Sequence, residues 1–141
     1  MTIQNYLSQI NYLSQNIAAK TEQAKDLKSF YTLIFSHISL SDGKIPANDD
    51  ITKRRVETAV NYQKLEKEIS EELDQLLLLK QTLQSAIEHI TEPKYRILLT
   101  LRYLNNLKWA EIAQRMNYDE RWVRRLHKPA LALLSPLVPM L

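Results

Sequence analysis

Four basic side chains near the C-terminal end are spaced so that they could bind an anionic partner together. Projection of residues 119–134 as a helix, at about 100° per residue, separates apolar from basic side chains. The apolar side holds Val123, Leu126, Ala130 and Leu134, with His127 beside them. The opposite side holds Arg121, Arg124, Arg125 and Lys128. Because arginine can grip a guanine edge or a phosphate with two hydrogen bonds, this face is predicted to contact DNA.

The residues before this helix predict the element that would position it. A helix-turn-helix needs a small residue in its first helix, a turn that tolerates positive φ, and a shared apolar face. Ile112 and Ala113 supply the apolar and small pair within a helix expected over residues 108–116. Asn117 belongs to the few non-glycine types that accept a left-handed conformation. Tyr118 is expected to be the buried residue of the turn, and Asp119 to cap the second helix.

Further residues join the predicted DNA contacts. An N-terminally presented recognition helix usually reads the major groove. Beside the four basic residues, the predicted contacts are Lys108, Glu120 and Trp122. Trp109 is expected to be packed within the domain. Pro129 removes one backbone hydrogen bond and is expected to kink the helix after Arg125, which weakens Lys128 as a contact.

The motif resembles region 4 of sigma-70-type factors. The resemblance is carried by the run from Leu101 to Ala113 (LRYLNNLKWAEIA) and by Val123 to His127 (VRRLH). The chain as a whole is similar to phage and prophage regulators of the ArpU/RinA type, with a close match over about residues 94–134. That resemblance implies activation of phage late genes in a bacterial host. Asparagine stands at both breaks, where sigma factors usually have glycine, and no equivalent of the promoter-melting region is present.

Composition narrows the class of protein. The chain has 141 residues, one Gly and no Cys, so glycine-rich phosphate loops, disulfides and thiolate metal sites are not expected. No paired carboxylates, Ser/His/Asp grouping or histidine metal set is evident, so neither an enzyme nor a cofactor or metal site is expected. No stretch approaches the roughly 18 apolar residues of a membrane span. The chain is expected to be cytoplasmic and away from membranes.

Charge is divided unevenly along the chain. Residues 1–92 hold ten basic and thirteen acidic side chains, whereas residues 93–141 hold nine basic and three acidic ones. The overall charge of +3 therefore comes from a C-terminal part at +6 and the rest at −3. An asymmetry of this kind points to an anionic partner for the basic part.

The remaining sequence predicts an all-α chain. Heptad-like apolar spacing predicts long helices over residues 2–35 and 52–90, joined by a loop at 36–51 that contains Gly43 and Pro46. Neither apolar stripe is stable alone in water, so an antiparallel, coiled-coil-like hairpin over 1–91 is expected, followed by the helix-turn-helix domain at 92–141. The run Leu76–Leu79 is apolar all round and predicts a further contact, with either the C-terminal domain or a second subunit.

Two classes of function follow. The first is a sequence-specific transcription regulator that binds double-stranded DNA as a homodimer or higher oligomer, with RNA polymerase as a further candidate partner. The second is a helical adaptor or DNA-packaging component that binds RNA polymerase or other proteins without enzymatic activity. The sequence distinguishes neither activation from repression nor one DNA target from another.

Overall fold

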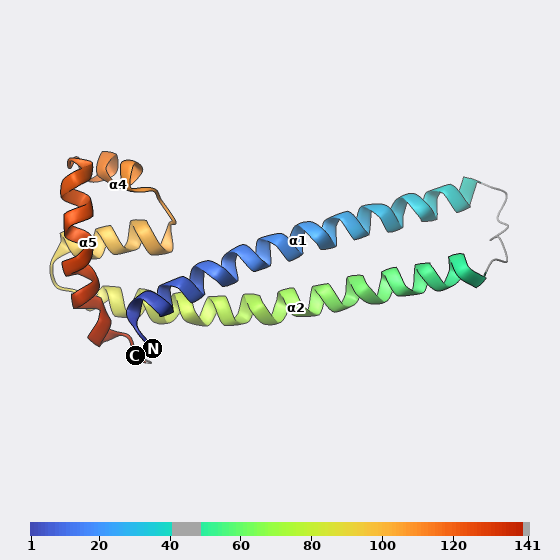
Figure 1. Ribbon diagram of the computed structural model, residues 1–141, viewed down its shortest axis with the longest axis horizontal. Coiled ribbons are helices and arrows are strands. Elements are labelled where there is room, and N and C mark those ends of the chain that lie inside the picture. The colour runs from blue at the N-terminus through green and yellow to red at the C-terminus, as the bar shows by residue number, and fades with distance from the viewer. Residues whose placement is uncertain (41–48, 140–141) are drawn as a thin grey trace. The chain divides into compact units, whose positions relative to one another are not determined.

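The computed structural model describes residues 1–40 and 49–139, and every regular element in these ranges is helical (Figure 1). The elements are α1 (Ile3–Leu40), α2 (Asp49–Glu88), α3 (Pro93–Leu99), the π-helical turn η1 (Thr100–Leu104), α4 (Trp109–Met116), α5 (Glu120–Leu134) and the 3₁₀ turn η2 (Ser135–Leu137). The all-α prediction is confirmed. No helix in the described ranges is long and apolar enough to cross a membrane.

Both long helices extend into the segment that was predicted to be a loop. Helix α1 continues to Leu40 rather than ending at residue 35, and α2 begins at Asp49 rather than at Thr52. Serine and histidine are tolerated in a helix end, and an acidic first turn suits the positive end of the helix dipole. The strongest helix breakers of the predicted loop, Gly43 and Pro46, lie outside the described residues.

The described chain forms two compact units, Met1–Tyr12 with Leu76–Leu141, and Leu13–Gln75. In the first unit, the start of α1 packs with the end of α2, and the hydroxyl of Tyr6 donates a hydrogen bond to the carbonyl oxygen of Leu79 at 2.8 Å. The core of this unit is apolar throughout, and its largest fully buried side chains are Tyr6, Leu83, Ile87, Leu98, Leu99, Ile112, Val123 and Leu134. The predicted boundary at residue 91 separates an oligomerisation hairpin from a DNA-binding domain. This functional division stays a prediction.

Ion pairs join α1 and α2 in the second unit. Lys20, which interrupts the apolar seam of α1, lies 2.6 Å from Glu72 Oε1 and 3.3 Å from Glu68 Oε2. Asn16 Nδ2 donates to both carboxylate oxygens of Glu72 at 3.1 Å. These two carboxylates raise the pKa of Lys20, with the hydrogen bond to Glu72 as the main cause. Because Asn16 and Lys20 advance along α1 while their partners recede along α2, the helices are antiparallel within this unit.

The leucine run of α2 has two environments. Leu79 is buried, whereas Leu77 and Leu78 are 57 % and 60 % exposed. Leu79 therefore has its partner within the first unit. Leu77 and Leu78 are not buried by the described residues, so a contact with a second subunit stays a prediction for those two side chains.

The apolar tail is anchored within the first unit. Val138 is 2 % exposed, so the chain returns to the core of this unit after α5. Met140 and Leu141 lie outside the described residues.

Candidate nucleic-acid interface

The two helices α4 and α5 are joined by three residues whose geometry follows from their types. Asn117 adopts the left-handed conformation, with φ 58° and ψ 40°, as predicted. The Tyr118 amide donates to the Ala113 carbonyl at 3.0 Å, which closes the end of α4. Asp119 caps α5, since its carboxylate accepts a hydrogen bond from the Arg121 amide at 3.4 Å.

The shared apolar face of α4 and α5 is buried as predicted. Ile112 and Val123 are 0 % exposed, and Ala113 and Leu126 are 6 % and 5 % exposed. The prediction for Tyr118 is wrong, because this side chain is 42 % exposed. Its backbone amide, rather than its side chain, serves the turn.

The basic side chains of α5 all lie on the exposed side of the helix, away from this core. Arg124 is held by Glu120 one turn earlier, with Nη2 2.9 Å and Nε 3.2 Å from the same carboxylate oxygen. Arg121, Arg125 and Lys128 make no ion pair within the described ranges. We call Arg121, Arg124, Arg125 and Lys128 the basic face of α5.

The other predicted contact residues have different surroundings. Lys108 is exposed immediately before α4, and Trp122 is 46 % exposed at the margin of the basic face. Glu120 is half-buried and is engaged with Arg124. Helix α5 runs from Glu120 to Leu134 through Pro129, so the proline lies inside a continuous helix.

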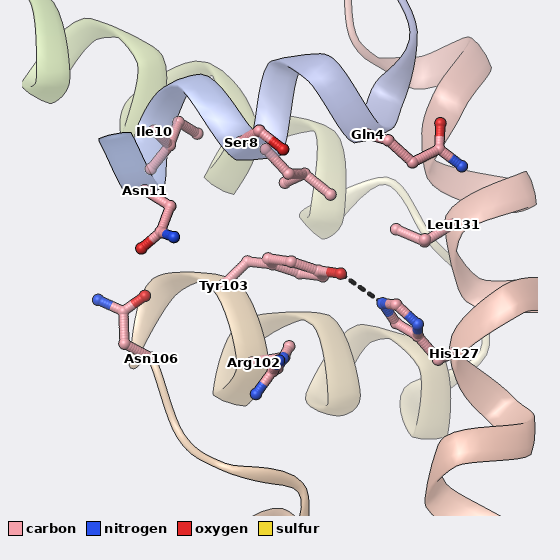
Figure 2. A pocket seen from close by; sticks show the side chains of 10 residues that line it. Gln4, Ser8, Ile10, Asn11, Arg102, Tyr103, Asn106, His127 and Leu131 are labelled. Atoms are coloured by element: carbon pink, nitrogen blue, oxygen red, sulfur yellow. Dashed lines mark hydrogen bonds between the residues drawn. The ribbon is translucent and has the colours of Figure 1, made fainter. Parts of the chain in front are cut away.

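A cluster that sequence reasoning missed lies behind the basic face. The hydroxyl of Tyr103 is hydrogen-bonded to Nε2 of His127, and the two rings stack with centroids 5.8 Å apart (Figure 2). The Trp109 ring meets His127 edge to face at 4.7 Å. On Trp109, the Arg102 guanidinium lies 4.5 Å from the ring centroid. We call these four residues the aromatic cluster.

The aromatic cluster changes the acid–base behaviour of its members. Burial raises the pKa of the Tyr103 hydroxyl. Burial, and then the charge of Arg102, lower the pKa of His127. His127 had been interpreted as a boundary residue of the recognition helix, because helical periodicity places it beside the core without naming a partner. Tyr103 and Trp109 both lie in the segment that carries the sigma-like resemblance. That resemblance was the one sequence signal that could have drawn attention to them as partners of His127.

A pocket of about 370 Å³ opens beside the aromatic cluster (Figure 2). One wall is the start of α1, and the other carries Tyr103, Asn106 and His127. Asn106 has φ 56°, the second left-handed asparagine of the described residues. No group of three or more metal-ligating side chains is found in the parts of the chain that the structure describes.

Comparison with known proteins assigns the chain to a family. A family model described as "Protein of unknown function (DUF722)" matches residues 42–133, nearly two thirds of the chain. No curated protein matches the chain, and no solved structure does.

Proposed function

Because the chain belongs to the family described as "Protein of unknown function (DUF722)", which carries no assigned activity, we propose a function from its own residues: it binds double-stranded DNA through α4 and α5. In this proposal α4, the Asn117 turn and α5 form a sigma-region-4-like helix-turn-helix. The start of α5 enters the major groove. The observation that carries the proposal is the exposed basic face of α5, directly opposite a buried apolar face on the same helix.

The arrangement of charges suits this role. Three of the four basic side chains have no ion-pair partner in the part of the chain that the structure describes, so they are available to phosphates and base edges. Glu120 holds Arg124 in a fixed orientation near the helix start, which favours a directed contact. Lys108 and Trp122 flank this surface as further contacts with the DNA backbone.

The proposed role is that of a sequence-specific transcription regulator, an activator of phage late genes by its resemblance to the ArpU/RinA type. One small recognition unit binds weakly, and two linked units gain affinity through effective concentration. The proposal therefore includes a homodimer or larger assembly formed by the long helices, here taken as an antiparallel hairpin. Leu77 and Leu78 support this part, since both are exposed apolar side chains on α2.

The test compares two triple variants of equal charge change. Fragments of the parent genome retained by the protein are first selected and sequenced, and one is used for fluorescence anisotropy. Changing Arg121, Arg124 and Arg125 to alanine should weaken binding by about 100-fold or more, at about 1–3 kcal/mol for each bidentate contact. The control variant has Lys25, Lys64 and Lys67, three exposed lysines of α1 and α2, changed to alanine. It should bind the DNA almost as tightly as the wild type does. Equal affinities for the two triple variants would remove the assignment.

A second candidate function is supported by a different surface. Trp122, Leu133 and Leu137 are 46 %, 44 % and 36 % exposed, and their spacing places them along one side of α5 and η2. Exposed apolar stripes of this kind are typical of protein contacts. A helical adaptor that binds RNA polymerase or a DNA-packaging protein would use this stripe. Such an adaptor would retain RNA polymerase in a pull-down and fail to bind any selected DNA fragment at low salt.

A further inference from the structure

His127 joins the recognition helix to the rest of its unit. It lies two residues after Arg125 and directly before Lys128, so the position of its ring constrains the helical turn that carries both cations. The contacts of that ring come from two other elements. Tyr103 on η1 is hydrogen-bonded to Nε2 (Figure 2). Trp109 on α4 packs against the ring edge to face, with centroids 4.7 Å apart.

Among the described residues, no carboxylate forms an ion pair with His127. From η1, the titratable or charged groups are Tyr103 and Arg102, and from α4 the contact is the neutral Trp109. The start of α1 contributes Gln4, Ser8 and Asn11 to the adjoining pocket, and all three are uncharged. Helix α3 packs against α5, and its buried residues are Leu98 and Leu99. On α5 itself, the nearest charged side chains are Arg124 and Lys128, which are also cations.

We propose that Tyr103 and His127 are a positioning pair for DNA binding: their contact holds α5 in the orientation that presents its basic face, and it does so fully only while the His127 imidazole is neutral. The inference rests on the proposed function and adds its regulation by pH. A proton on His127 would place a second cation beside Trp109, which Arg102 already contacts, in a half-buried site where the described residues supply no ion-pair partner. The lowest-energy response is movement of α5 away from Tyr103 and Trp109, toward water.

The direction of the pH effect follows from linkage. Burial lowers the pKa of His127 in the folded protein below its ordinary value of 6.5. The stabilisation is therefore fully present above pH 6.5 and is lost as the pH falls through the lowered pKa. DNA binding by arginine and lysine alone does not weaken on acidification, because phosphates stay ionised and the protein gains positive charge. A loss of affinity on acidification is therefore the opposite of what ordinary charge attraction predicts.

The variants separate positioning from simple packing. His127→Gln places a neutral amide near the position of Nε2, so it keeps a hydrogen-bonding partner for Tyr103 and cannot titrate. Tyr103→Phe keeps the ring and removes the hydroxyl. His89→Gln is the matched control, since His89 is exposed directly after α2 and its Nδ1 contacts the Ser85 carbonyl of that helix at 2.7 Å.

Affinity for a selected DNA fragment is measured by anisotropy at constant salt. Between about pH 7.5 and about pH 5.5, the wild type and His89→Gln should lose about threefold or more in affinity. His127→Gln should bind well at the higher pH and show no loss at the lower one. Tyr103→Phe should bind more weakly than His127→Gln at the higher pH. Identical pH profiles for the wild type and His127→Gln would overturn the inference while leaving DNA binding intact.

The unfolding temperature of the same variants provides the second readout. It should fall on acidification in the wild type and much less in His127→Gln. If the unfolding temperatures separate in this way but the affinities do not, the pair contributes packing only and the positioning role is overturned. If the wild type binds no DNA even at about pH 7.5, the proposed function fails, and the inference fails with it as a statement about DNA. The unfolding data would then describe a pH-sensitive packing contact alone.

Discussion

The guanidinium of Arg102 lies 4.5 Å from the centroid of the Trp109 ring, and its Nη1 donates to the Leu107 carbonyl at 3.0 Å. The Arg102 side chain thereby contacts both the segment that precedes α4, at Leu107, and the first residue of α4, Trp109. Arginine suits this double contact because its planar cation can stack and donate at the same time.

Replacing Arg102 with methionine should destabilise the first unit by about 1–2 kcal/mol, from one cation–π contact and one hydrogen bond. The same change removes the charge that adds to the effect of burial on His127. The pKa of His127 should therefore rise toward its ordinary value and stay below it, since burial remains the larger cause. Denaturant unfolding and an NMR titration of the His127 ring measure the two effects. A His127 pKa that does not rise would show that Arg102 has no electrostatic influence on it.

Salt should weaken DNA binding steeply. Each phosphate neutralised by a lysine or arginine contributes a slope of about −0.9 in log affinity against log salt. Changing Arg121, Arg124 and Arg125 to alanine should make this slope shallower, whereas changing Lys25, Lys64 and Lys67 should leave it unaltered. Affinities from about 50 to 200 mM salt give the slopes. The same slope for both variants would mean that the basic face of α5 does not contact phosphate.

Asn117 should be the most sensitive residue of the turn between α4 and α5. At φ 58°, a side chain that branches at Cβ collides with the backbone, and alanine lacks the local hydrogen bonding of asparagine. Asn117→Ala is expected to cost about 1 kcal/mol and Asn117→Gly to be neutral or stabilising. Asn11→Ala, on an exposed part of α1 in the same unit, should cause no loss. Denaturant midpoints compare the three, and an Asn117→Ala variant as stable as Asn11→Ala would contradict the expectation.

Leu83 and Leu78 form a matched pair on α2. Leu83 is 0 % exposed, so Leu83→Ala should destabilise the first unit by about 2–5 kcal/mol. Leu78 is 60 % exposed within the chain, so at protein concentrations too low for self-association Leu78→Ala should stay within about 0.5 kcal/mol of the wild type. A larger, concentration-dependent loss is expected where the proposed oligomer forms, and its absence would show that no second copy covers this side chain.

Pro129 lies inside α5 and cannot donate to the Arg125 carbonyl. Pro129→Ala restores a donor and should stabilise the protein by about 1 kcal/mol or more, up to the 3 kcal/mol or so that proline costs in a helix interior. Thermal unfolding measures the gain. A loss of stability would show that the proline ring makes packing contacts of greater value than the missing hydrogen bond.

The sequence was sufficient for the parts of the site that depend on local rules. The αL conformation of Asn117, the cap by Asp119 and the opposite faces of α5 follow from residue type and helical period. The prediction that Tyr118 is buried was wrong, because its backbone amide closes the end of α4 while its side chain is exposed. A sequence pattern does not distinguish a role of the backbone amide from a role of the side chain. The contact between Tyr103 and His127 joins residues 24 positions apart, so no helical periodicity could reveal it.

The long helices show the same limit. Apolar spacing was enough to predict two helices of this kind, although α1 and α2 extend into residues that were assigned to a loop. Lys20 interrupts the apolar seam of α1. Its partners, Glu68 and Glu72, lie about fifty residues away on α2, so the spacing within one helix does not reveal the contact.

Those ion pairs also bear on alignment. An apolar seam with a seven-residue repeat fits its partner almost equally well after a shift of one heptad, so hydrophobic burial alone leaves several alignments of α1 against α2 close in energy. In the second unit, only one alignment brings both Asn16 and Lys20 to Glu72. After a shift of one heptad, the places of Glu68 and Glu72 would be taken by Gln75 and Leu79 or by Asn61 and Leu65, so the ammonium group would have no carboxylate there. Lys20, which interrupts the apolar seam, thus sets the register of α1 against α2 within the second unit.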